Sequence, residues 1–146
     1  DWDDIDEHLM IFLSKTCKSV YNKPDIHKHL DNGIIGTSLV ELKNDNKKQI
    51  RDVQINDILA NGEKVLGIIK IDAVILNKLQ DYKVDGKNIV GVNINICSRK
   101  ETIRKDMSDI LIKEKYLYHL LTKSGTFRVN GIPIRDYNYG IDKYTI

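Results

Sequence analysis

Three turn dipeptides constrain the fold of this chain more than any other feature. Asn61-Gly62, Asp85-Gly86 and Asn130-Gly131 each lie between runs that are rich in β-branched residues. Such pairs favour type I′ turns, because both central residues must adopt positive φ and these residue types do so at little cost. With no helical pattern between them, the three hairpin signals predict an all-β meander and argue against a parallel α/β sheet.

Strand-like runs flank these turns. The runs expected to form strands are residues 39–42, 65–71 and 88–96, together with a tail over 117–138 that reads as strand, turn, strand, Asn-Gly turn, strand. Residues 98–115 are ambiguous and fit either one helical turn or a polar loop. Within that stretch Ile110-Leu111-Ile112 is a further strand candidate.

The first 31 residues differ from the rest. Their apolar residues recur at helical spacing, at Trp2, Ile5, Leu9, Phe12, Leu13 and Val20. Asp4 followed by Glu7 fits a capping box, and Pro24 supplies a stop. The pattern predicts an amphipathic helix over residues 4–21 that packs on the β domain or on a neighbouring domain. We therefore divide the chain into an N-terminal helix and linker, residues 1–31, and a β domain, residues 32–146.

Size and composition narrow the class of protein. A chain of 146 residues with 41% hydrophobic residues is long enough for one packed domain. The formal net charge is +2, and no basic run interleaves with aromatic residues, so a nucleic-acid partner is not expected. No apolar run approaches the roughly 20 residues that span a membrane. The chain starts with Asp1, which is typical of a piece of a longer protein.

The two cysteines, Cys17 and Cys97, form no Cys-x-x-Cys pair and no disulfide framework. This pattern favours a reducing, intracellular setting, in the cytoplasm or in a virus particle. We expect no cofactor.

Residues 37–42 and then 48–59 resemble the opening block of Hint domains, the fold shared by inteins and the hedgehog autoprocessing domain. That block runs from a Thr through a Val-containing strand and a polar turn to Gly-Asp, for which this chain has Asn56-Asp57. Residues 67–71 continue the pattern of Hint domains in large DNA viruses and some protists. The tail over 117–138 has the shape of the closing motif, so the resemblance covers residues 32–144.

The resemblance implies a self-processing chemistry whose three reacting positions differ here. Asn32 stands where a Cys, Ser or Thr attacks the preceding carbonyl, and asparagine cannot perform that shift. Residues 89–96 match the middle block but contain neither the Thr nor the His of Thr-x-x-His. Arg135-Asp136 replaces the closing His-Asn, whose Asn would cyclise. The resemblance therefore implies a retained scaffold without its reaction.

Several other residues have both a chemical and a structural interpretation. His27 and His29 have the spacing of two metal ligands on a strand, but zinc needs two more, and surface histidines in a linker are favoured. His119 is either a general acid or, as we expect, a strand histidine packed on one face. Cys97 is the best remaining thiol for an alternative nucleophile, but a buried structural cysteine is favoured, and Cys17 is expected to be half-buried on the helix.

Two further groups complete the candidates. Asn32-Gly33 is a sequence prone to deamidation and more often a plain turn, and Asn138 is either a shifted cyclising Asn or part of a closing turn. Tyrosines gather near the C-terminus, at Tyr116, Tyr118, Tyr137, Tyr139 and Tyr144. They form either a binding surface or ordinary strand packing, and we favour packing.

We therefore expect a mostly-β, Hint-like compact domain of short β-hairpins with an N-terminal α-helix. We predict no catalytic, cofactor-binding or metal residues. Its function is expected to be that of a catalytically inactive module in a larger viral protein, with protein partners that are neighbouring domains or a second copy, and with no nucleic acid or membrane. One alternative is an autoprocessing Hint domain that uses a non-standard nucleophile. Another is a small β-barrel that binds nucleic acid, against which the near-neutral charge counts.

Overall fold

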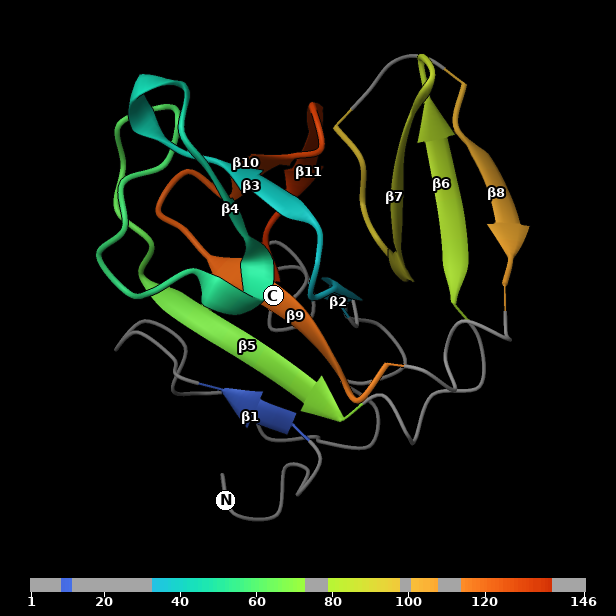
Figure 1. Ribbon diagram of the computed structural model, residues 1–146, viewed down its shortest axis with the longest axis horizontal. Coiled ribbons are helices and arrows are strands. Elements are labelled where there is room, and N and C mark those ends of the chain that lie inside the picture. The colour runs from blue at the N-terminus through green and yellow to red at the C-terminus, as the bar shows by residue number, and fades with distance from the viewer. Residues whose placement is uncertain (1–8, 12–32, 73–78, 98–100, 108–113, 138–146) are drawn as a thin grey trace, which may run out of the picture.

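The computed structural model describes residues 9–11, 33–72, 79–97, 101–107 and 114–137 of the chain (Figure 1). Over these residues the fold is mostly β, as predicted. The strands are β1 (Leu9–Ile11), β2 (Gly33–Ile35), β3 (Leu39–Glu41), β4 (Lys47–Gln49), β5 (Gly67–Asp72), β6 (Gln80–Val84), β7 (Lys87–Val92), β8 (Ile103–Asp106), β9 (Tyr116–Leu121), β10 (Thr126–Val129) and β11 (Ile132–Arg135). Two short 3-10 helices, η2 (Lys43–Asp45) and η3 (Ile50–Asp52), flank β4.

The described strands form two sheets with antiparallel neighbours. One sheet has seven strands in the order β1-β5-β9-β2-β7-β6-β8, and the other has four in the order β11-β10-β3-β4. The short strand β2 lies between β7 and β9, with Ile34 opposite Gly91 on one side and Tyr118 on the other. Segments far apart in sequence therefore meet at β2.

Two of the three predicted hairpins have the predicted turn type. Asp85-Gly86 joins β6 to β7 with φ of 53° and 77°, and Asn130-Gly131 joins β10 to β11 with φ of 52° and 78°. Both pairs have the positive φ of a type I′ turn. Asn61-Gly62 also closes a turn, in which the Leu59 amide donates to the Glu63 carbonyl at 2.8 Å. There only Gly62 has positive φ, so this turn is of a different, longer type.

The predicted strands are confirmed with shifted ends. The run 39–42 forms β3 and the run 65–71 forms β5, whereas the run 88–96 ends as a strand at Val92. Asn93 takes a positive φ of 53° directly after it. The strand β8 lies inside the ambiguous stretch 98–115, where all four of its residues are exposed. A strand without a buried face has no apolar alternation, so periodicity cannot reveal it.

The helix predicted over residues 4–21 is wrong at Leu9–Ile11. These residues form β1, which pairs antiparallel with β5 and places Leu9 opposite Ile71. A short apolar run fits a strand as well as a helix, and the backbone edge of β5 decides between them. The rest of the predicted helix, and with it the docking residues Trp2 and Phe12, lie outside the described residues.

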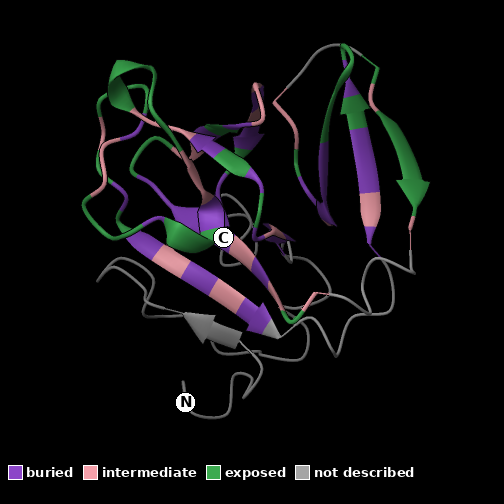
Figure 2. Cartoon of the chain, viewed as in Figure 1, coloured by how far each residue is buried: buried purple, intermediate pink, exposed green. Residues whose placement is uncertain are grey.

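The main core lies between the two sheets. Buried residues alternate with more exposed ones along β10 and β11, which is the pattern of strands with one face on a core. A similar alternation can be followed along β5 in Figure 2. The core is made by Ile34, Val40, Ile50, Val53, Leu59, Val65, Tyr82, Val84, Ile89, Ile94, Leu120, Phe127, Val129, Ile132 and Ile134. A second, smaller cluster of Leu79, Val90 and Leu117 lies on the other face of the seven-stranded sheet, because Val90 and Leu117 have the opposite alternation to the core residues Ile89 on β7 and Leu120 on β9.

Among the described residues, the structure contains no helix with the length and apolar character needed to cross a lipid bilayer.

Candidate functional site

A buried polar cluster joins the end of β9 to the residues that follow β11. We define the polar cluster as His119, Thr122, Asp136 and Tyr137, each at most 1% exposed. One carboxylate oxygen of Asp136, Oδ2, accepts hydrogen bonds from the Thr122 amide at 2.6 Å and the Thr122 hydroxyl at 2.9 Å. The Asp136 amide donates to the Gly125 carbonyl at 2.9 Å. Asp136 therefore ties the end of the closing hairpin to the turn between β9 and β10.

His119 is oriented by backbone and by rings. Its Nδ1 accepts a hydrogen bond from the Leu120 amide at 3.0 Å, which in neutral imidazole leaves the proton on Nε2. The ring meets Phe127 and Tyr137 edge to face, with 5.7 Å between centroids in both pairs. His119 is therefore a packed strand histidine, as predicted, and as a general acid it would have no access to solvent.

The strand β2, which follows Asn32, pairs with β7 on one side and β9 on the other. A Cβ atom at Gly33 would lie 2.7 Å from the Tyr118 carbonyl oxygen, and a Cβ at Gly91 would overlap the Gly33 carbonyl. Gly33 also has a φ of 108°, a conformation that L side chains rarely adopt. The backbones of β2, β7 and β9 thus approach closely next to the position of Asn32, which itself lies outside the described residues.

The closing block lies beside the end of the middle block. The Arg135 amide donates to the Asn95 carbonyl at 2.8 Å, and the Cys97 amide donates to the Pro133 carbonyl at 2.9 Å. Cys97 is a free cysteine of intermediate exposure. Burial raises the pKa of its thiol, and the charge of Arg135 only partly opposes this, so the thiol is protonated at neutral pH and is a poor nucleophile.

Asn56 and Asp57 form a hydrogen-bonded turn before Ile58. Asn56 has a φ of 74°, in the left-handed region where Gly is favoured and Asn is the best tolerated alternative. The Asp57 carboxylate accepts hydrogen bonds from the Gln54 amide at 2.8 Å and from Lys48 Nζ at 2.9 Å. Partial burial alone would raise the pKa of Asp57, but these hydrogen bonds and the Lys48 charge hold it below its ordinary value. Asp57 thus stabilises the turn that Asn56 makes.

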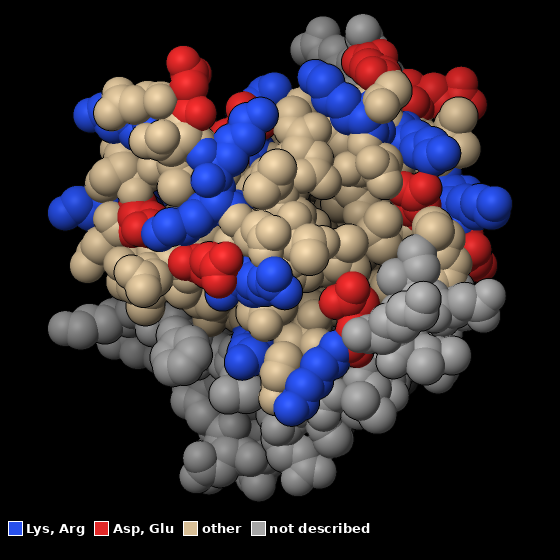
Figure 3. Space-filling view, in the orientation of Figure 1, with Lys and Arg blue, Asp and Glu red and all other residues tan. Residues whose placement is uncertain are grey.

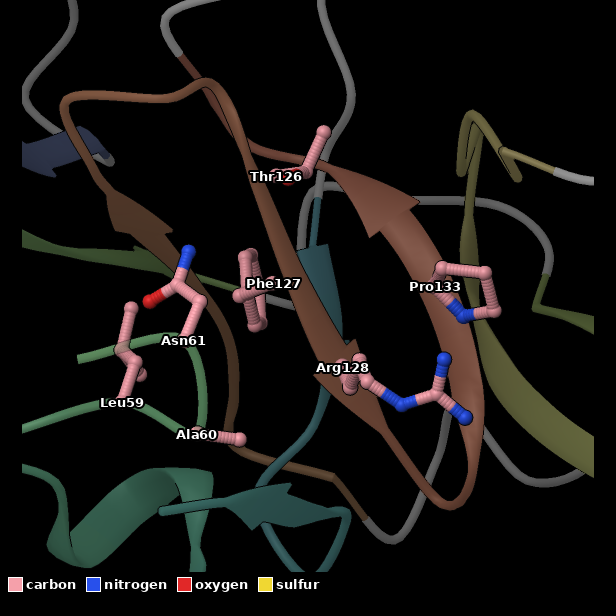
Figure 4. A pocket seen from close by; sticks show the side chains of 7 residues that line it. All are labelled: Leu59, Ala60, Asn61, Thr126, Phe127, Arg128 and Pro133. Carbon is pink, nitrogen blue, oxygen red and sulfur yellow. The ribbon is translucent and has the colours of Figure 1, made fainter. Parts of the chain in front are cut away.

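A cavity of about 240 Å³ opens between the loop after Leu59 and the strands β10 and β11 (Figure 4). It is lined by Leu59, Ala60, Asn61, Thr126, Phe127, Arg128 and Pro133. Arg128 is held in place, because its Nε donates to Glu41 Oε1 at 3.4 Å and its Nη2 donates to the Gly131 carbonyl at 3.0 Å. Phe127 touches both the cavity and the ring of His119, so it separates the cavity from the polar cluster.

The remaining predicted candidates do not form a common site. His27, His29, Cys17, Asn138, Tyr139 and Tyr144 lie outside the described residues. Tyr137 is buried in the polar cluster, while Tyr116 on β9 is covered by Lys70, whose Nζ lies 4.2 Å from the ring centroid. The described residues contain no group of three His, Cys, Asp or Glu side chains that could hold a metal ion. Lys and Arg side chains are interspersed with Asp and Glu on the face shown in Figure 3.

Neither a comparison with protein-family models nor a comparison with curated proteins gives a match to this chain.

Proposed function

We propose that this chain is a catalytically silent Hint-like module, which serves a larger protein as a structural or protein-interaction domain. Asp136 is the observation that carries the proposal. It stands where the pattern has the cyclising Asn, yet its carboxylate is buried and bound by both the amide and the hydroxyl of Thr122. A carboxylate in such a hydrogen-bonded arrangement acts as a structural tie and is a weak nucleophile.

The surroundings of the other reacting positions support the same proposal. Residues 89–96 supply the inner strand β7 and its continuation, without a Thr or His to protonate a leaving amide. The scaffold features of the pattern persist, since Asn56 keeps the positive φ of the usual Gly and Asp57 keeps its hydrogen bonds. Selection for folding without selection for the reaction gives this combination.

We further propose that the protein works inside a cell or in a virus particle, as large DNA viruses carry such modules. Cys97 supports a reducing setting, since it is a free cysteine whose protonated thiol is not poised for exchange.

The decisive experiment places a tag at each end of residues 1–146 and incubates the protein for a day with and without a strong thiol and hydroxylamine. We expect an unchanged intact mass. Release of the N-terminal tag would contradict the proposal, because it requires an ester or thioester at a reacting residue. A Cys97→Ser variant, tested in parallel, decides whether the Cys97 thiol is that residue and thus tests the autoprocessing alternative.

A further inference from the structure

The strand β8 presents an open edge of the seven-stranded sheet. It pairs with β6 through Ile103 to Asp106, and no strand among the described residues pairs with its other edge (Figure 1). All four residues of β8 are exposed, and Ile103 is 62% exposed, the largest value among the large hydrophobic residues in the described part of the chain. An exposed edge of this kind is a template for pairing with another strand.

The hydrogen bonds to β6 determine which backbone groups point outward. The Met107 amide donates to the Leu79 carbonyl at 2.7 Å. Because an antiparallel ladder alternates between hydrogen-bonded and non-hydrogen-bonded residues, the odd-numbered residues of β8 bond to β6. The backbone groups of Thr102 and Arg104 therefore face away from β6, toward the open edge.

We propose that two copies of this chain associate through an antiparallel β8–β8 pair centred on Ile103. In this register Ile103 lies opposite Ile103 of the second copy, and Thr102 lies opposite Arg104 of the second copy. The latter two residues have outward backbone groups, so they form the hydrogen-bonded pair that an antiparallel ladder needs. Glu101 then lies opposite Lys105 of the second copy, and the two-fold axis repeats that pair.

The charges of the strand favour this register over the two registers centred on Arg104 and on Lys105. Only registers that pair outward-facing residues with each other can form an antiparallel ladder. A pair centred on Arg104 would place Arg104 opposite its own copy, and one centred on Lys105 would do the same for Lys105. Like charges directly opposite each other destabilise a sheet. The register centred on Ile103 instead places opposite charges and two isoleucines in the non-hydrogen-bonded positions, where side chains come closest.

Charged residues on an edge strand often prevent pairing. Here the register centred on Ile103 instead places Glu101 opposite Lys105 of the second copy, a pair of opposite charges that stabilises a sheet. The inference rests on β8 alone and goes beyond the proposed function, since it would hold whether or not the chain processes itself. The two tests can therefore fail separately. Cleavage of the chain would contradict the proposed function, and an uncleaved chain that stays monomeric would contradict the β8 pairing.

The test measures the mass of residues 1–146 by sedimentation equilibrium over a wide range of concentrations. We expect a dimer of twice 16.8 kDa. Lys105→Glu and Glu101→Lys should each weaken self-association about tenfold, because each turns both symmetry-related pairs into like charges. An equal mixture of the two variants should form a heterodimer, since the substituted side chain of each variant then faces the opposite charge on the substituted side chain of the other.

A second variant addresses the apolar centre of the interface. Ile103→Lys places two lysines face to face and should give a monomer, while the matched control Ile55→Lys, at another exposed isoleucine, should leave the dimer intact. Circular dichroism checks that each variant is folded. A wild-type chain that is monomeric at every concentration would overturn the proposal. So would a dimer that tolerates Ile103→Lys, or single variants that do not associate when mixed.

Discussion

Asp136 shows how one side chain stabilises the closing hairpin. Replacing it by Ala removes both hydrogen bonds from Thr122 and leaves a buried amide and hydroxyl without this acceptor. We expect Asp136→Ala to lower the free energy of unfolding by about 3 kcal/mol. Asp136→Asn, which keeps one carbonyl oxygen as an acceptor, should cost less, and urea unfolding of both variants checks the order. Equal stability of Asp136→Ala and the wild type would exclude the structural tie.

Asp57 gives the stability of the chain a pH dependence at the residue scale. Its pKa in the folded chain lies below the ordinary value of 3.8, so its contribution to stability is fully present above that value and is lost as the pH falls through the folded pKa. Urea midpoints measured from neutral pH down to the acid limit should show this loss. In Asp57→Asn the loss should be smaller, because the titrating group is absent. If the urea midpoints of the wild type and of Asp57→Asn fall equally with pH, Asp57 is not the group whose titration lowers the stability.

At the scale of elements, the turns β6–β7 and β10–β11 form a matched pair. Gly86 and Gly131 have nearly the same φ, 77° and 78°, but a Cβ at Gly86 meets nothing within 4 Å, whereas one at Gly131 would lie 2.9 Å from the Lys87 side chain. Both Gly→Ala variants should lose about 1 kcal/mol from φ alone. Gly131→Ala should lose slightly more, and Gly131→Val more again, as thermal or urea unfolding will show. If Gly86→Ala lowers the free energy of unfolding more than Gly131→Ala does, the contact of the added Cβ with Lys87 does not destabilise the chain.

Elements whose signal is local can be predicted from sequence, and elements that depend on distant partners cannot. The Asp85-Gly86 and Asn130-Gly131 turns follow from two residues each. Residues 4–21 have the apolar spacing of a helix, and the strand β1 within them has no local signature, because β5, its pairing partner among the described residues, lies about 60 residues away in sequence. For the same reason the contact between Thr122 and Asp136, 14 residues apart, has no signature in the spacing. The packing of His119 is predicted correctly, because burial alternates from Tyr116 to His119 and such an alternation is a local signal.

At the scale of the whole molecule, β1 connects the N-terminal part of the chain to the larger sheet. Because Leu9–Ile11 pair with β5, we expect at least this part of residues 1–31 to pack on the β domain of the same chain and not on a partner module. Removing residues 1–22 deletes β1 and leaves the Gly67–Asp72 edge unpaired. This deletion should lower the melting temperature, by about 3 °C for each kcal/mol lost in a chain of this size.

The deletion should be made in the Ile103→Lys background, so that self-association through β8 does not mask its effect. Under this condition an exposed β5 edge should also bind an apolar dye and promote new association, because an uncovered strand offers unpaired backbone groups. Calorimetry and sedimentation of the deleted and full chains provide both measurements. An unchanged melting temperature, with no new association, would mean that β1 adds nothing to the sheet and that residues 1–22 serve a neighbouring module instead.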